Sequence, residues 1–169
     1  PPDEPTSINH FNELMKFMDS KEYIHYEISN FCKENYHSHH NSNYWFGGKY
    51  LGIGPSAHSY NGEERQWNIS NVTEYIEKLD NEIIPFQKET LSTEQKFNEY
   101  LMISLRTIHG CDLNYINQEF GEKYHDHILK ESLKYIECDH LKAIDNKLYL
   151  TQEGKLFADR IASELFIPG

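Results

Sequence analysis

Residues that begin and end helices divide the second half of the chain into short amphipathic segments. Ser92-Thr93-Glu94-Gln95 has the form of a capping box, in which side chains satisfy the free N–H groups of a helix start. Gly110 and Gly121 each follow apolar residues at helical spacing and indicate helix ends. The predicted helices carry Phe97, Leu101, Leu105 and Ile108; then Leu113, Ile116 and Phe120, after a cap at Asp112; then Ile128, Leu129, Leu133 and Ile136.

A hairpin and a last helix complete this region. Two short apolar segments, 141–144 and 148–150, flank the turn residues Asp145-Asn146 and predict two antiparallel strands. Thr151 is placed to cap a final helix whose inward residues are Phe157, Ile161 and Leu165. Because helices, a hairpin and a helix follow one another, we expect residues 91–169 to form a helical, winged-helix-like domain.

The first ninety residues have a looser pattern. Thr6 or Ser7 is placed to cap a helix, and the segment 23–29 alternates as a strand does. A helix followed at once by a strand is typical of an α/β layer or barrel. One such unit cannot bury itself, and the chain starts without Met, so we expect a fragment of a larger domain. The apolar face of this first helix comprises Phe11, Leu14, Met15 and Met18.

Residues 30–70 are predicted to be irregular, with a short strand over 49–53. Asn71 is placed to cap another helix, and residues 81–90 are expected to be a connector. Aromatic residues throughout the irregular segment argue against disorder, and a loop of this length is usually functional. The expected buried face of the helix after Asn71 comprises Val72, Tyr75, Ile76 and Leu79.

Charge and cysteine content exclude several classes of protein. The net charge of −11 repels phosphate backbones, and residues 91–169 carry 9 basic and 13 acidic side chains, a net of −4, which disfavours a DNA-binding winged helix. The cysteines, Cys32, Cys111 and Cys138, form neither a disulfide framework nor a C-x-x-C pair, which favours a reducing, cytoplasmic setting. No apolar run approaches the ~18 residues of a membrane span, so membrane association would require a partner.

The segment His40–Trp45 combines an imidazole, a common metal ligand, with two large aromatic residues. Haem iron accepts an axial histidine, and the macrocycle favours aromatic contacts. On the pattern alone, an ordinary loop with anchored aromatics and exposed histidines is the favoured interpretation. A zinc site of Cys32 with His37, His39 and His40 does not match the usual ligand spacing.

Small residues over 52–57 allow positive φ and the close approach of a ligand, although a lone Gly-x-Gly lacks the remaining features of a dinucleotide site. Glu27 ends a predicted strand, where barrel enzymes place functional groups, or where a plain salt bridge forms. Arg65 and Asn68 are either carboxylate ligands or surface loop residues.

Taken together, three ordered motifs resemble a known family. They are YEISNF at 26–31, HNSNYW at 40–45 and YLGIGPSAHSY at 50–60. The chain resembles the C-terminal part of the radical-SAM, oxygen-independent coproporphyrinogen III oxidase-like family, closest to its haem-chaperone branch. The last helix start, Leu150-Thr151-x-x-Gly154, is also similar to the family's C-terminal domain. The resemblance covers nearly the whole chain.

The resemblance implies an α+β fold: the tail of a partial (β/α) radical-SAM barrel over 1–60, a connector with one helix over 61–90 and the helical winged-helix-like domain over 91–169. Family members hold a [4Fe-4S] cluster that cleaves S-adenosyl-L-methionine; the oxidases act on coproporphyrinogen III, and the chaperones deliver haem to acceptor proteins. By resemblance, the haem contacts are His40, Asn41, Tyr44 and Trp45, and the edge of the S-adenosyl-L-methionine pocket is Gly52, Gly54, Ala57 and His58.

The family's cluster motif, C-x3-C-x2-C, is absent, and cysteines separated by 79 and 27 residues cannot replace it. We therefore expect the chain alone to be inactive and assign it no catalytic or metal-binding residue. Cys32-Lys33-Glu34-Asn35 also replaces the family's usual Ala-Lys/Arg-Pro-Gly. The alternatives are a true coproporphyrinogen III dehydrogenase of porphyrin biosynthesis, with Arg65 receiving a carboxylate, and a non-enzymatic winged-helix interaction module.

Overall fold

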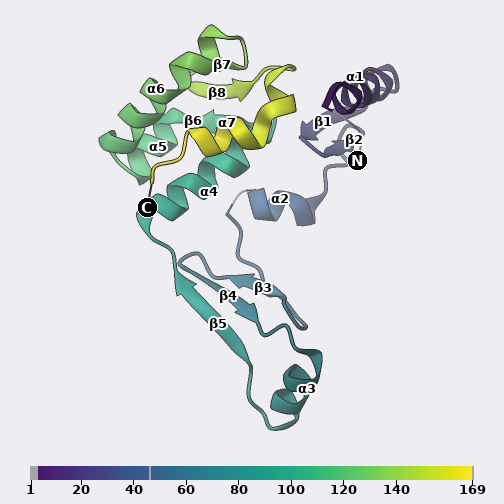
Figure 1. Ribbon diagram of the computed structural model, residues 1–169, viewed down its shortest axis with the longest axis vertical. Coiled ribbons are helices and arrows are strands. Elements are labelled where there is room, and N and C mark those ends of the chain that lie inside the picture. The colour runs from purple at the N-terminus through teal and green to yellow at the C-terminus, as the bar shows by residue number, and fades with distance from the viewer. Residues whose placement is uncertain (1–3, 46, 169) are drawn as a thin grey trace. The chain divides into compact units, whose positions relative to one another are not determined.

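The computed structural model describes residues 4–45 and 47–168, and its contacts group the chain into two compact units (Figure 1). The first unit comprises Pro1–Ser38 together with Thr93–Gly169, and the second comprises His39–Ser92. Both units contain helices and strands, so the expectation of a mixed α and β fold is confirmed. The division of domains at residues 60 and 90, which followed the family resemblance, stays a prediction.

The first unit begins with α1 (Glu4–Ser20) and an antiparallel hairpin of β1 (Ile24–Glu27) and β2 (Asn30–Cys32). The strand predicted over 23–29 is present as β1, but it is shorter than predicted, because the chain turns back at residues 28–29. The Glu27 carboxylate stabilises this turn, since its Oε2 accepts hydrogen bonds from Ser29 N at 2.8 Å and Asn30 Nδ2 at 2.5 Å. A local side-chain acceptor thus replaces strand continuation.

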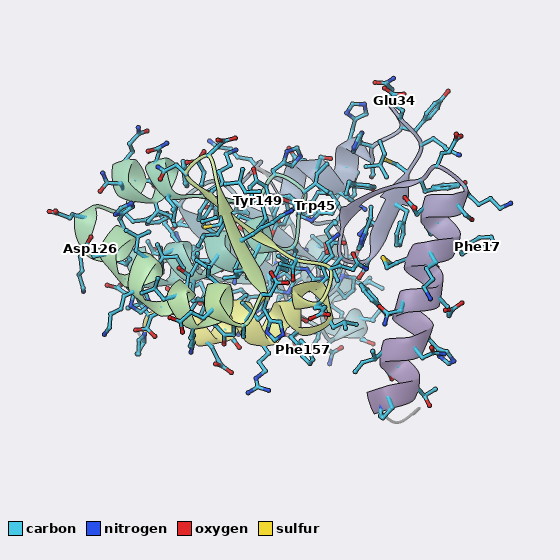
Figure 2. All side chains as sticks on the ribbon, turned by 90° about the horizontal axis from the view of Figure 1, so that it is seen from above. Phe17, Glu34, Trp45, Asp126, Tyr149 and Phe157 are labelled. Carbon is cyan, nitrogen blue, oxygen red and sulfur yellow. The ribbon has the colours of Figure 1, made fainter. Side chains whose placement is uncertain are left out.

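Helix α1 differs from the sequence prediction at both its start and its face. Thr6 and Ser7 lie inside the helix, so neither caps it. The side chain of Leu14, expected to be buried, is 42% exposed, and Phe17, labelled in Figure 2, is 58% exposed. The other residues of the predicted face are only half-buried: Phe11, Met15 and Met18.

The core of the first unit lies in its C-terminal part. Asp112 caps α5 (Leu113–Glu119), because its Oδ1 accepts hydrogen bonds from Asn114 N at 2.9 Å and Tyr115 N at 3.1 Å. The predicted turn at Asp145-Asn146 is present between β7 (Leu141–Ile144) and β8 (Lys147–Leu150), and both of its residues have positive φ, 49° at Asp145 and 61° at Asn146. The strand order is β6-β8-β7. The elements are α4 (Thr93–Leu105), β6 (Cys111–Asp112), α5 (Leu113–Glu119), α6 (Glu122–Glu137), β7 (Leu141–Ile144), β8 (Lys147–Leu150), the 3-10 turn η1 (Gly154–Phe157) and α7 (Ala158–Glu164).

Several helix faces in this part differ from prediction. Ile108 lies beyond the end of α4 and is 44% exposed. On α6, Leu129 and Leu133 were expected inside but are 41% and 55% exposed. The inward face instead carries Tyr124, Ile128, Ser132 and Tyr135. Tyrosine can be buried in this core because its hydroxyl donates a hydrogen bond to a carboxylate at the edge of the core. Tyr124 Oη donates to Glu94 Oε1 at 2.9 Å, and Tyr135 Oη donates to Glu164 Oε2 at 2.5 Å.

The final helix is also divided. Thr151 Oγ1 accepts a hydrogen bond from Gly154 N at 3.0 Å, but the residue at the cap position of η1 is Glu153, so the prediction that Thr151 caps the last helix is wrong. Helix α7 follows from Ala158. Phe157, labelled in Figure 2, is half-buried at this junction. Ile161 and Leu165 are 1% and 0% exposed, as expected for the inward face.

The second unit contains α2 (His39–Trp45), α3 (Val72–Asp80) and an antiparallel sheet of order β3-β4-β5: β3 (His58–Tyr60), β4 (Glu64–Asn68) and β5 (Phe86–Thr90). Residues 30–70 are therefore more regular than predicted, and β5 occupies the predicted connector. Segment 49–53 is no strand, although Tyr50 forms one isolated bridge to Tyr60. Asn71 caps α3 as predicted, accepting a hydrogen bond from Glu74 N at 3.1 Å.

The predicted buried face of α3 is wrong for this unit. Val72, Ile76 and Leu79 are 59%, 52% and 42% exposed, and Tyr75 is half-buried. The spacing predicted the helix correctly. Among the described residues of this unit, however, no apolar core packs against the predicted face. Spacing predicts which residues share a face, and the packing partner decides whether that face is buried.

We predict that Ile128→Ala lowers the free energy of unfolding by about 2–5 kcal/mol, because it removes a fully buried side chain and leaves a cavity. Leu133→Ala is the matched control on the same helix, and we expect it to cost less than about 1 kcal/mol because that side chain is 55% exposed. Urea denaturation followed by circular dichroism measures both values. Equal losses would contradict the observed orientation of α6.

Candidate functional site

A row of aromatic rings in the second unit begins on α2. The exposed His40 ring meets the Tyr44 ring edge-on, with centroids 5.1 Å apart, because residues at i and i+4 share one helix face. The Tyr44 ring lies 4.6 Å from that of Tyr50, which lies 6.2 Å from that of Tyr60. We call these four residues the aromatic row. Within the described part of the chain, no residue hydrogen-bonds to the ring nitrogens of His40.

The surroundings of the aromatic row are partly apolar. Asn41 and Trp45, on the same helix as His40, are half-buried. Leu51 and Ile53 come one and three residues after Tyr50 in the chain and are 77% and 86% exposed. These two exposed apolar side chains are available to contact a ligand or another protein surface. The sequence prediction missed both residues, although their position between small residues of a proposed binding motif was a signal for them.

The glycine turn is held by internal hydrogen bonds. Gly52 N donates to Ser59 Oγ at 3.0 Å, and Gly54 N donates to Tyr75 Oη at 3.3 Å. Asn68, only 4% exposed, donates from Nδ2 to the Gly54 carbonyl at 2.9 Å. The Asn68 side chain is thus committed to the turn and is neither a surface residue nor placed for a carboxylate ligand.

Glycine is favoured at two positions of this turn for different structural reasons. A Cβ at residue 52 would overlap the backbone carbonyl of His58, so only glycine allows this close approach. Gly54 has φ of 105°, which favours glycine, and space is open beside its Cα. Ala57 is half-buried, whereas His58 is exposed and stacks on Trp67 with centroids 6.2 Å apart. The turn therefore presents His58 outward from a rigid base.

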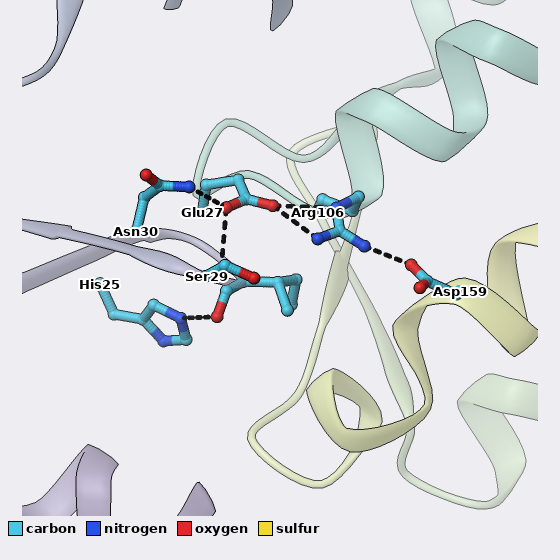
Figure 3. Close-up of polar contacts among 7 residues, drawn as sticks. His25, Glu27, Ser29, Asn30, Arg106 and Asp159 are labelled. Carbon is cyan, nitrogen blue, oxygen red and sulfur yellow. Dashed lines mark hydrogen bonds and ion pairs between the residues drawn. The ribbon is translucent and has the colours of Figure 1, made fainter. Parts of the chain in front are cut away.

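Glu27 lies in the first unit, where it forms a buried ion pair. Its side chain is 5% exposed, and its Oε1 accepts from Arg106 Nε at 2.9 Å and Nη2 at 2.8 Å (Figure 3). Arg106 Nη1 also pairs with the exposed Asp159. With Oε2 engaged by Ser29 and Asn30, the carboxylate is fully used inside the protein. The structure supports the salt-bridge interpretation of Glu27.

The remaining candidates do not form a metal or carboxylate site. Arg65 pairs with Glu89 across the sheet, with 3.6 Å between Nη1 and Oε1. Cys32 and Cys111 are buried, and burial raises the pKa of the Cys111 thiol to about 12, so it stays protonated. Over residues 4–45 and 47–168, no three His, Cys, Asp or Glu side chains are placed to hold a metal ion. A [4Fe-4S] cluster does not fit these residues.

Known proteins resemble the chain over most of its length, although no family profile matches it. The heme chaperone HemW of Bacillus subtilis is 29% identical over 150 residues, covering 88% of this chain and 39% of that protein. HemW of Buchnera aphidicola subsp. Schizaphis graminum is 30% identical over 168 residues, covering 93% and 43%. The mitochondrial radical S-adenosyl methionine domain-containing protein 1 of Danio rerio is 40% identical over 58 residues, covering 34% and 13%.

A solved structure has the same fold. Coproporphyrinogen III oxidase (HemN) from Escherichia coli, described as a radical SAM enzyme, matches with a TM-score of 0.76 and 16% identity. The match covers 98% of this chain and 42% of that one. The chain spans about 40% of the length of the curated relatives it matches.

The sequence matches support the resemblance to the radical-SAM, coproporphyrinogen III oxidase-like family, and the structural match shows that the chain shares the fold of one part of HemN. Within that family the chain is similar to the haem-chaperone branch, because several of the matched relatives are heme chaperone HemW proteins. The resemblance carried by its three motifs is therefore confirmed.

We predict that Glu27→Ala lowers the free energy of unfolding by about 3–5 kcal/mol, because it removes a buried acceptor from the half-buried Arg106 guanidinium and from the donors of the hairpin turn. Asp159→Ala is the matched control. It removes the other partner of the same guanidinium, but this carboxylate is 72% exposed and we expect a loss below about 1 kcal/mol. Thermal and urea unfolding measure both. A small effect of Glu27→Ala would argue against the structural role.

Proposed function

We propose that this chain is the C-terminal part of a radical-SAM haem chaperone, and that haem binds at His40 with Asn41, Tyr44 and Trp45. The aromatic row is the observation that supports this proposal. It presents an exposed imidazole without a hydrogen-bond partner among the described residues, next to the Tyr44 ring at 5.1 Å, which in turn lies 4.6 Å from the Tyr50 ring. These are the groups that a haem ligand site requires.

The chain's own residues have distinct roles in this proposal. A neutral imidazole of His40 offers a nitrogen lone pair to the haem iron. The ring of Tyr44 limits the rotation of His40, while Leu51 and Ile53 offer apolar surface to the macrocycle. Haem is cargo here, and an acceptor protein would receive it. No described helix has the length and apolar character needed to cross a bilayer, and we propose that contact with a membrane is made through the acceptor.

The edge of the S-adenosyl-L-methionine pocket is proposed at Gly52, Gly54, Ala57 and His58. The internal hydrogen bonds of this turn and the open space beside Gly54 support a fixed, accessible backbone there. That cofactor would supply radical chemistry when bound, with a cluster held by residues other than those of this chain. We assign no catalytic residue here and propose that the chain alone is inactive.

The C-terminal part, 91–169, is proposed to be a winged-helix-like interaction domain attached to the tail of a partial barrel. Its element order, α4-β6-α5-α6-β7-β8, and its strand order, β6-β8-β7, support the winged-helix-like description. Its net charge of −4, from 9 basic and 13 acidic residues, favours a protein partner over nucleic acid.

We predict that His40→Ala weakens haem binding by about tenfold or more, equivalent to about 1.4 kcal/mol, and shifts the Soret band because the axial nitrogen is lost. A haem titration of the full chain followed by visible absorption measures both. His39→Ala is the matched control, since it removes a neighbouring exposed histidine of α2. Added imidazole is expected to restore the Soret position of His40→Ala. Unchanged affinity and spectrum in His40→Ala would exclude the ligand role.

A further inference from the structure

A separate cleft lies wholly within the first unit. Its volume is about 190 Å³, and its walls come from β1, the chain after α4, the β7–β8 hairpin and η1. Backbone hydrogen bonds fix the first two walls together, from Ile28 N to the Arg106 carbonyl at 3.0 Å and from Ile108 N to the Tyr26 carbonyl at 3.1 Å. Tyr149, labelled in Figure 2, comes from β8. The cleft is thus a fixed feature of the unit.

The residues that line this cleft carry more positive than negative charge. Glu27 and Arg106 neutralise each other in their buried ion pair. Lys142 and Lys155 also line the cleft, and no described carboxylate lies within ion-pair distance of either ammonium. The cleft therefore carries uncompensated positive charge in a chain whose net charge is −11. Burial and the neighbouring Lys142 lower the pKa of Lys155, so its charged form lacks adequate stabilisation.

Lys155 is held in place by an acceptor that carries no negative charge. His25 Nε2 lies 2.9 Å from the Ile28 carbonyl, which can only accept, so this nitrogen carries the proton (Figure 3). His25 Nδ1 then accepts from Lys155 Nζ, 3.2 Å away. Burial lowers the pKa of His25, which favours this neutral form. The histidine positions the ammonium without neutralising it, which leaves the charge available to a ligand.

The walls beside the lysines are largely apolar. Leu105 and Leu150 are 2% and 7% exposed, whereas Ile108 is 44% exposed. An ion in such a setting is less well hydrated than on an open surface, so a ligand of opposite charge binds more strongly there. A small ligand with one anionic group and a short apolar body matches the walls, the charge and the volume.

We propose that this cleft binds a small ligand through an oxyanion, either a carboxylate or a phosphate group, held by the ammonium groups of Lys142 and Lys155. The site is separate from the proposed haem site, which lies in the other unit. It requires no metal and no bond making or breaking. His25 is a positioning residue, because it acts through Lys155.

We test the proposal on the full, uniformly 15N-labelled chain by NMR, titrating inorganic phosphate in one arm and sodium acetate in another, with sodium chloride at matched ionic strength as the reference. Phosphate or acetate is expected to give saturable shifts of the His25 ring signals that chloride does not produce. Saturation by phosphate alone, acetate alone or both supports the oxyanion site and identifies which group it takes. Shifts no larger than those with chloride in both arms would overturn the proposal.

Variants locate the binding. Lys155→Gln is expected to weaken the anion affinity at least tenfold, Lys155→Arg to retain most of it, and the exposed Lys142→Gln to weaken it severalfold with little risk to folding. Lys130→Gln is the control, since it makes the same change of charge on α6 at a side chain that is 81% exposed. Equal weakening by Lys130→Gln and Lys142→Gln would show that net charge alone is responsible and would refute the site.

Discussion

The Glu27 carboxylate joins the N-terminal hairpin to the C-terminal core of the first unit. One oxygen closes the turn between β1 and β2, and the other holds the Arg106 guanidinium with contacts of 2.8 and 2.9 Å. A carboxylate buried as deeply as that of Glu27 is tolerated only when its hydrogen bonds are satisfied, because its desolvation is costly, whereas the Arg106 side chain is still 26% exposed. The pair is therefore a constraint on geometry: it sets β1 beside residues 106–108 and so creates one wall of the cleft.

In the second unit, the buried side chain of Asn68 likewise fixes the backbone of a turn through hydrogen bonds. Its buried amide donates to the Gly54 carbonyl, and the backbone groups of the glycine turn find their other partners in Ser59 and Tyr75. A backbone that leaves its sheet needs such donors and acceptors, since unpaired buried polar groups cost about 1–3 kcal/mol each. Because the hydrogen-bonding groups of the turn are paired within the protein, the exposed residues beside it are available to contact a ligand.

The C-terminal elements could be predicted from the sequence because their signals are local. Asp112, Asn71 and the Asp145-Asn146 turn act through hydrogen bonds or φ angles within a few residues of themselves. The β4–β5 pair escaped prediction because its strands carry few apolar residues, and cross-strand contacts such as Glu64 to Lys88 at 2.7 Å hold them. Such contacts join residues far apart in sequence, and periodicity does not report them.

The same distinction applies to the candidate sites. The motif of His40 and Tyr44 was noticed from its residue types, although its segment was predicted to be irregular, and helix α2 then brings the two rings together. By contrast, His25 and Lys155 are 130 residues apart, and only the folded chain places them in contact. Their contact depends on the register of β1 against residues 106–108, which the Glu27–Arg106 pair maintains. A basic cleft in an acidic chain is thus a consequence of one buried ion pair, which consumes the carboxylate that could otherwise have neutralised the lysines.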